Sequence, residues 1–151
     1  MYKSIVVGID GSETARAAML KAADLAKLTG ARVHLVTASA KGRLSELVGL
    51  DPMAAGMVET LQRTEQELTT ASSEMLKRAA DELRSAGVEA ETYLVEDDPA
   101  GAILSVAESA SGDLIVVGNK GMRGAKRFVL GSIPNAVAHR ATCDVTIVRT
   151  T

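Results

Sequence analysis

The chain has few of the residues that build several common kinds of functional site. Of its 151 residues, one is cysteine, two are tyrosine, one is phenylalanine and none is tryptophan. A single cysteine, Cys143, excludes an internal disulfide and any metal site that needs several thiolates. So few aromatic rings leave almost no stacking platform for the bases of single-stranded nucleic acid. We expect Cys143, which lies beside an apolar run, to be a buried and unreactive thiol.

Strong charge and long apolar runs are also absent. The 17 basic and 19 acidic residues give a net charge of −2, which does not favour general binding to nucleic acid or to anionic membranes. No apolar run approaches the roughly 18 residues of a membrane span, and the opening residues lack the pattern of a signal peptide. We therefore expect a single cytoplasmic domain over residues 1–151.

Short apolar runs rich in β-branched residues predict buried parallel strands, which need not alternate because helices cover both faces. Four such runs are found at Ile5–Ile9, Val33–Val36, Leu114–Val117 and Val145–Val148. A fifth run, Val88–Val95, alternates between apolar and polar residues. This alternation is typical of an edge strand with one wetter face.

Between these runs, apolar residues recur at helical spacing. The predicted helices cover Ser12–Thr29, about 59–86, a segment that starts at Asp98-Pro99, and about 132–141. Asp98 is expected as an N-cap with Pro99 at the first helical position, while Gly30 and Gly87 end the first two helices. The apolar face of the second helix is marked by Leu61, Leu68, Met75, Ala79 and Leu83.

The alternation of strands and helices predicts an α/β fold with an open five-stranded parallel sheet and helices on both faces. We find no internal repeat. The segment Ser39–Met57 has three glycines, a proline and mixed polarity, and we interpret it as a long loop. A functional lid and simple disorder are both open for it.

Ligands of open parallel sheets bind beyond the carboxyl ends of the strands, so the residues that follow each strand deserve attention. Gly8, Ile9 and Asp10 follow the first predicted strand. Gly118, Gly121 and Gly124 follow the fourth at three-residue steps, among the basic residues Lys120, Arg123, Lys126 and Arg127. Gly131-Ser132 then opens the last predicted helix.

A glycine-lined loop can present successive amides to an anion without interference from a Cβ. A helix N-terminus adds free amides and partial positive charge. These features predict an anion site between the fourth strand and the last helix. The alternative is that Ser132 is only an N-cap and that the glycines are only turn residues.

The spacing Gly118-x2-Gly121-x9-Gly131-Ser132 resembles the G-x2-G-x9-G-(S/T) signature of the ATP-binding universal stress proteins. The resemblance covers nearly the whole chain, including Ile5–Ser12, Asp113–Gly118 and Cys143–Val148. It implies a Rossmann-like fold of the adenine nucleotide alpha-hydrolase type, with strand order 3-2-1-4-5. It also implies a homodimer that pairs through the fifth strand, here Val145–Val148.

The resemblance further implies roles for individual residues. Gly8, Ile9 and Asp10 form the turn near the ribose and phosphates, where Asp10 can hold a divalent metal. Ala38 contacts adenine through its backbone. The remaining implied nucleotide contacts are Gly118 and Gly121 at the ribose and phosphates, Arg123 in the phosphate loop, and Gly131, Ser132 and Ile133 at the helix start.

Elementary electrostatics supports a metal at Asp10. A carboxylate close to a polyphosphate is repelled unless a cation intervenes. Mg²⁺ commonly joins one or two carboxylates to substrate phosphates, so Asp10 together with ATP predicts Mg²⁺ or Mn²⁺. The alternative is that Asp10 only caps the first helix.

Several catalytic motifs are missing. There is no G-x4-G-K-(S/T) and no G-x-G-x2-G, which excludes a P-loop NTPase and leaves no dinucleotide fingerprint. His34 and His139 have no zinc-binding spacing, and we interpret both as structural. We therefore expect ATP to be a regulatory or sensing ligand in a stress response, with at most slow hydrolysis. The alternatives are a weak ATPase or phosphoryl-transfer enzyme that uses metal at Asp10, a chaperone-like dimer with a vestigial site, and a protein whose ligand is cAMP or AMP.

Overall fold

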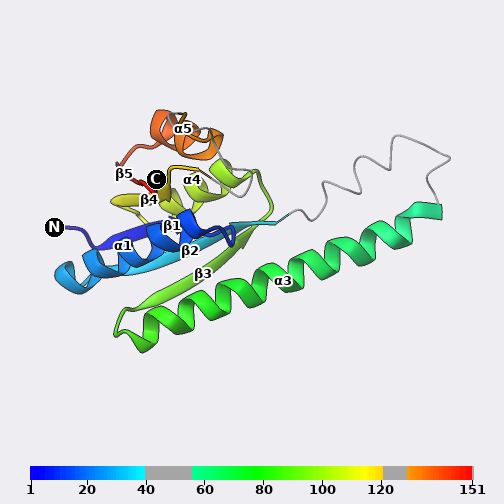
Figure 1. Ribbon diagram of the computed structural model, residues 1–151, viewed down its shortest axis with the longest axis horizontal. Helices are drawn as coiled ribbons and strands as arrows, with labels where there is room; N and C mark the ends of the chain where they lie inside the picture. The colour runs from blue at the N-terminus through cyan, green and yellow to red at the C-terminus, as the bar shows by residue number, and fades with distance from the viewer. Residues whose placement is uncertain (40–55, 121–128, 151) are drawn as a thin grey trace.

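The computed structural model describes residues 1–39, 56–120 and 129–150. Five parallel strands form one sheet with helices on both faces (Figure 1). The strands are β1 Ser4–Gly8, β2 Arg32–Ala38, β3 Ala90–Val95, β4 Leu114–Gly118 and β5 Asp144–Val148. Their order across the sheet is β3-β2-β1-β4-β5. This confirms the implied order, and it confirms that the alternating run is an edge strand.

The central strand β1 pairs with β2 on one side and with β4 on the other. Ile5 lies opposite Val33 of β2 and opposite Leu114 of β4. The chain continues from β1 to β2 on one side and returns to β4 on the other. Such a reversal leaves a crevice at the carboxyl ends of the two flanking strands, which is where open α/β sheets bind ligands.

Four described helices connect the strands, and their ends follow the predicted capping residues. They are α1 Glu13–Thr29, α3 Val58–Ser85, α4 Pro99–Ser109 and α5 Ser132–Arg140. The Ser12 side chain caps α1, and Gly30 ends it in the left-handed region at φ 74°. Asp98 accepts a hydrogen bond from the Gly101 amide at the start of α4. The roles of Gly30 and Asp98 were therefore predicted correctly, whereas the cap at Ser12 was not predicted.

The hydrophobic core lies in two layers, one on each face of the sheet. Alternate residues of β1 divide between them: Ile5 and Val7 pack with α1 and α3, whereas Val6 packs with α4 and α5. Figure 1 shows α1 and α3 on one side of the strands and α4 and α5 on the other. No helix in the described part of the chain is long and apolar enough to cross a membrane.

Helix α3 packs on the sheet along only part of its apolar face. Leu76, Ala80 and Leu83 in its C-terminal half are buried, whereas Leu68 of the predicted apolar face is 48% exposed. A helix of 28 residues is about 42 Å long, whereas the seven residues of β2 span about 23 Å. The N-terminal half therefore projects beyond the sheet (Figure 1).

The predicted loop Ser39–Met57 lies mostly outside the described residues. Ser39 is buried directly after β2, and its amide donates to the Val95 carbonyl at 2.7 Å. Gly56 and Met57 form a short turn that leads into α3. The two alternatives that the sequence left open for this segment, a functional lid and simple disorder, fall outside the described residues.

Candidate functional site

A cavity of about 350 Å³ lies at the carboxyl ends of β1, β2 and β4. This volume is within the range of about 300–1,000 Å³ that is usual for small-molecule sites. The residues that line it come from three strand ends and four helices. They are Gly8, Ile9, Asp10, Val36, Thr37, Ala38, Val117, Gly118 and Lys120 from the strands and their following turns, and Ala15, Leu68, Ala71, Ser72, Met75, Pro99, Ile103, Ile133 and Pro134 from or beside the helices.

Six of the predicted site residues line this one cavity: Gly8, Ile9, Asp10, Ala38, Gly118 and Ile133. Gly131 and Ser132 lie directly beside Ile133 at the start of α5. Gly121 and Arg123 lie outside the described residues. Predicted site residues that are far apart in the sequence therefore lie around one cavity.

Most of the cavity wall is apolar, which suits a flat, weakly polar ring. Leu68, Ala71 and Met75 come from α3, and Ile103 comes from α4. The sequence analysis assigned none of these helix residues to a site. No local pattern identifies them, because they face the cavity only through the packing of α3 and α4 onto the sheet.

The turn after β1 is held by hydrogen bonds that use its backbone groups. The Ile9 amide donates to the Val36 carbonyl at 2.8 Å, and the buried Thr37 hydroxyl donates to the Ile9 carbonyl at 2.8 Å. Both bonds tie β1 to β2 at the edge of the cavity. They position Asp10, which follows immediately.

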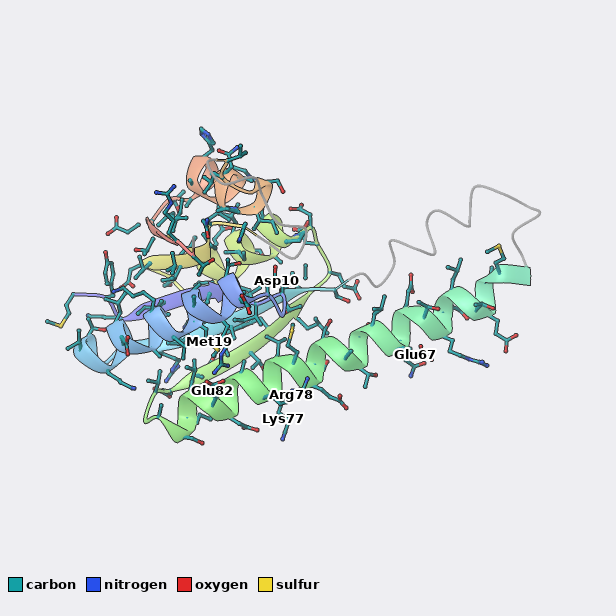
Figure 2. All side chains as sticks on the ribbon, in the orientation of Figure 1. Asp10, Met19, Glu67, Lys77, Arg78 and Glu82 are labelled. Carbon is teal, nitrogen blue, oxygen red and sulfur yellow. The ribbon has the colours of Figure 1, made fainter. Side chains whose placement is uncertain are left out.

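Asp10 presents one carboxylate oxygen to the protein and keeps the other available. Its Oδ1 accepts from the Ser12 amide at 2.9 Å and from Ser12 Oγ at 2.5 Å. Its Oδ2 has no hydrogen-bond partner among the described residues. Ser12, and not Asp10, is the residue that caps α1, so capping does not explain the carboxylate. Figure 2 shows Asp10 at the end of the sheet beside the first turn of α1.

Gly118 is glycine for a reason that differs from the predicted one. A Cβ at this position would lie 2.7 Å from Thr14 Cβ and 2.9 Å from the Thr14 carbonyl oxygen. The close approach is therefore to the start of α1. The packing of β4 against α1 requires the glycine even without a ligand.

At the start of α5, two amides have no hydrogen-bond partner among the described residues. The Gly131 amide donates to the Asn119 carbonyl at 2.9 Å, and the Asn135 amide donates to the Gly131 carbonyl at 3.1 Å. Between them, Pro134 has no amide hydrogen, and the Ser132 and Ile133 amides have no partner among the described residues. A helix N-terminus with unpaired amides favours anions.

Two details at this helix start differ from the expectation. The Gly131 amide, expected to be free, is already bonded. Gly131 is the N-cap, and Ser132 is the first residue of α5 and is exposed. The alternative that Ser132 serves only as a cap is therefore wrong, and its hydroxyl is available to a ligand.

The remaining candidate residues lie away from the cavity. His34 is 5% exposed, with Nδ1 3.1 Å from the Tyr93 hydroxyl, and burial lowers the pKa of its imidazole. His139 is exposed at the C-terminal end of α5. Cys143 is half-buried, less than expected, and burial raises the pKa of its thiol. No histidine or cysteine is among the described residues that line the cavity.

Comparison with known proteins agrees with this architecture. Residues 1–149 match the model of the universal stress protein family. The chain is 32% identical over 151 residues to universal stress protein YxiE of Bacillus subtilis, an alignment that covers 99% of this chain and all of that protein.

Two solved structures are similar and carry adenine nucleotides. One is a universal stress protein in complex with cAMP, with a TM-score of 0.68 and 29% identity over 99% of this chain and 98% of that one. The other is the universal stress protein from Archaeoglobus fulgidus in complex with dAMP, with a TM-score of 0.70 and 26% identity over 97% of both chains.

Proposed function

The chain belongs to the universal stress protein family, and we propose that it binds ATP with a divalent cation, as a regulatory or sensing ligand in a stress response. The proposed site is the cavity at the carboxyl ends of β1 and β4. The observation that carries the proposal is the pair of amides at Ser132 and Ile133, which have no partner in the described part of the chain and lie directly beside an apolar cavity of nucleotide size.

The apolar wall of the site suits the adenine ring, and the start of α5 suits the phosphates. The adenine ring packs against the apolar side chains of Met75 and Ile103 and meets the backbone of Ala38. The phosphates lie toward Lys120 and the start of α5, where free amides and the helix dipole favour negative charge. The similar structures with cAMP and dAMP support an adenine nucleotide as the ligand class.

The available oxygen of Asp10 fits a hard divalent cation. The described residues contain no cluster of three or more metal-binding side chains. Mg²⁺ or Mn²⁺ would therefore take Asp10 Oδ2 as its protein ligand and complete its coordination with phosphate oxygens and water, as Mg²⁺ does in many nucleotide sites. The cation would also offset the repulsion between Asp10 and the phosphates.

The site favours retention of ATP over its hydrolysis. A general base for water needs a titratable side chain within hydrogen-bond reach of the attacking atom. Asp10 would be occupied through both oxygens, by Ser12 at Oδ1 and by the proposed cation at Oδ2, and the described part of the lining has no histidine or cysteine. We therefore propose turnover that is at most slow.

We also propose a cytoplasmic homodimer that pairs through β5. The Asn119 amide donates to the Val148 carbonyl at 3.0 Å, so Val148 and Thr146 direct their backbone groups toward β4. The backbone groups of Val145 and Ile147 then face outward. Unpaired groups on an edge strand are a template for pairing with a second strand.

Isothermal titration with MgATP tests the nucleotide site. A Cβ at Gly131 would lie 3.2 Å from Lys120 Cα and 3.3 Å from the Asn119 carbonyl oxygen, so Gly131→Val should displace the helix start and weaken binding at least about tenfold, a loss of ~1.4 kcal/mol. Gly56→Val is the matched control, because a Cβ there meets nothing within 4 Å. An absence of binding heat from the wild type at high micromolar protein would contradict the proposal.

A cyclic or monophosphorylated ligand is the second candidate, and the similar structure that holds cAMP favours it. Competition between cAMP and MgATP in one titration separates the two. MgATP should displace cAMP if the cation and the start of α5 contribute to binding. Tighter binding of cAMP than of MgATP would assign the site to the cyclic nucleotide.

A further inference from the structure

One buried hydroxyl group, that of Thr14, joins the two loops that border the cavity. Thr14 lies in the first turn of α1 and is 3% exposed. Its Oγ1 donates a hydrogen bond to the carbonyl oxygen of Lys120, which lies 106 positions further along the chain. A carbonyl oxygen can only accept, so the direction of this bond is fixed.

The Thr14 hydroxyl is also connected, through Ser12, to Asp10, the proposed metal ligand. Thr14 Oγ1 lies 3.1 Å from Ser12 Oγ, and Ser12 Oγ lies 2.5 Å from Asp10 Oδ1. Asp10, Ser12, Thr14 and the Lys120 carbonyl therefore form one series of polar contacts. The series connects the turn after β1 with the loop after β4.

Packing adds a second restraint at the same place. Gly118 has no Cβ and lies directly against Thr14, in the contact described above. Lys120 Cα lies 3.2 Å from the position that a Cβ of Gly131 would occupy, and the Gly131 amide donates to the Asn119 carbonyl. The segment 118–120 is thus held between Thr14 on one side and the start of α5 on the other.

We propose that Thr14 is a positioning residue for the nucleotide phosphates. It sets the backbone at Lys120, and through that segment it sets the spacing between the free amides of α5 and Asp10. Thr14 does not line the cavity and acts through Lys120. The proposal rests on nucleotide binding at this cavity, and it predicts an effect on the phosphates with little effect on the adenine ring.

Titration of three proteins with two probes tests this role. The proteins are the wild type, Thr14→Val, which keeps the shape and loses the hydroxyl, and Thr14→Ser, which restores it. The probes are MgATP and adenosine. Thr14→Val should bind MgATP about tenfold more weakly, because the partly buried Lys120 carbonyl loses its only described partner, and should bind adenosine within about twofold of the wild type. Thr14→Ser should resemble the wild type with both probes.

Unchanged MgATP affinity in Thr14→Val would overturn the proposal, and so would equal losses for MgATP and adenosine, which indicate general damage. If Thr14→Val does not fold, Thr14→Ser and Thr14→Ala form a pair that differs only in the hydroxyl, and the same contrast applies to them.

Amide hydrogen exchange at Gly131 provides a readout without ligand. Loss of the Thr14 hydroxyl should speed exchange of this amide about tenfold, because its acceptor Asn119 adjoins Lys120. Equal exchange rates would overturn the positioning role. A wild type that binds neither probe would refute the proposed function instead, and the exchange experiment would still decide whether Thr14 holds the loop.

Discussion

Two glycines at the carboxyl edge of the sheet, Gly8 and Gly118, are surrounded by different kinds of atom. A Cβ at Gly8 would lie 2.6 Å from Ile103 Cδ1, the far end of a flexible side chain. A Cβ at Gly118 would meet Thr14 Cβ and the Thr14 backbone within 2.9 Å. A side-chain end can rotate away, whereas the backbone of a buried helix start cannot.

The Gly118→Ala substitution should therefore destabilise the protein by about 1–3 kcal/mol, and Gly8→Ala should cost less. In an Ile103→Val background, which removes Cδ1, the cost of Gly8→Ala should shrink further. Denaturant unfolding in a double-mutant cycle measures both effects. Equal costs at the two glycines, or no coupling between Gly8 and Ile103, would contradict this account of the packing.

His34 belongs to a polar cluster on the sheet, away from the cavity. Its Nδ1 contacts the Tyr93 hydroxyl, Tyr93 donates to Glu91 at 2.7 Å, and Arg32 pairs with Glu91 at 3.1 Å. Burial is the largest cause of its lowered pKa; Arg32 adds to this effect, whereas Glu91 and Glu89 oppose it. The folded protein thus prefers the neutral imidazole.

Stability should consequently decline as the pH falls below about 6.5, because the unfolded chain takes up the His34 proton before the folded protein does. The decline ends once the pH passes the lowered pKa of the folded state. The hydrogen bond from Tyr93 lowers the pKa of Glu91, and this affects stability only at more acidic pH, below the ordinary glutamate pKa of 4.5. Unfolding free energies at about pH 7.5 and 5.5 should differ less in His34→Gln than in the wild type. The same difference in both proteins would show that His34 does not contribute.

At the scale of elements, α3 performs two separate tasks along its length. Its C-terminal half packs on the sheet through Leu76, Ala80 and Leu83. Further toward the N-terminus, Leu68 and Ala71 line the cavity while remaining exposed. Figure 2 shows Glu67 on the projecting part, whereas Lys77, Arg78 and Glu82 lie on the half that runs along the sheet.

A leucine-to-alanine substitution in each half of α3 distinguishes its role in stability from its role in binding. Leu76→Ala removes a side chain that is 3% exposed and should cost about 2–5 kcal/mol of stability. Leu68→Ala should change stability by no more than about 0.5 kcal/mol but should weaken binding of MgATP. Thermal unfolding and titration of both variants check the two predictions. A large loss of stability in Leu68→Ala would contradict the division of α3.

Local sequence signals predicted the elements well because their causes are local. The cap at Asp98, the end of α1 at Gly30 and the alternation in Val88–Val95 each depend on a few neighbouring residues. The exposure of Leu68 on the apolar face of α3 was not predicted, because helical periodicity does not reveal where the sheet beneath a helix ends.

The candidate site was predicted in part for the same reason. The strand-end rule found Gly8, Ile9, Asp10, Ala38 and Gly118, which all line the cavity. It missed the wall from α3 and the role of Thr14, since both arise from contacts between segments that are distant in the sequence. It also explained Gly118 by a ligand, where the structure explains it by Thr14.

At the scale of the whole molecule, the sheet ends in two different edges. Thr92 on β3 is exposed, and Thr146 on β5 is partly buried within the protomer. Val145, Ile147 and Val148 of β5 pack against the two cores only partly. A second copy paired along β5 would cover these side chains and the outward backbone groups of Val145 and Ile147.

Sedimentation equilibrium should therefore give twice the chain mass of 15.7 kDa for the wild type. Thr146→Asp places a carboxylate at the proposed interface and should shift the protein toward the monomer. Thr92→Asp on the opposite edge is the matched control and should remain a dimer. If Thr92→Asp dissociates the dimer and Thr146→Asp does not, the interface lies at β3.

The central claim is that an adenine nucleotide lies in the cavity with its phosphates at the start of α5. A crystal structure of the protein with MgATP tests it most directly. The account predicts phosphate oxygens within hydrogen-bond distance of the Ser132 and Ile133 amides, with the cation beside Asp10 Oδ2. An empty cavity, or a nucleotide whose phosphates point away from α5, would contradict it.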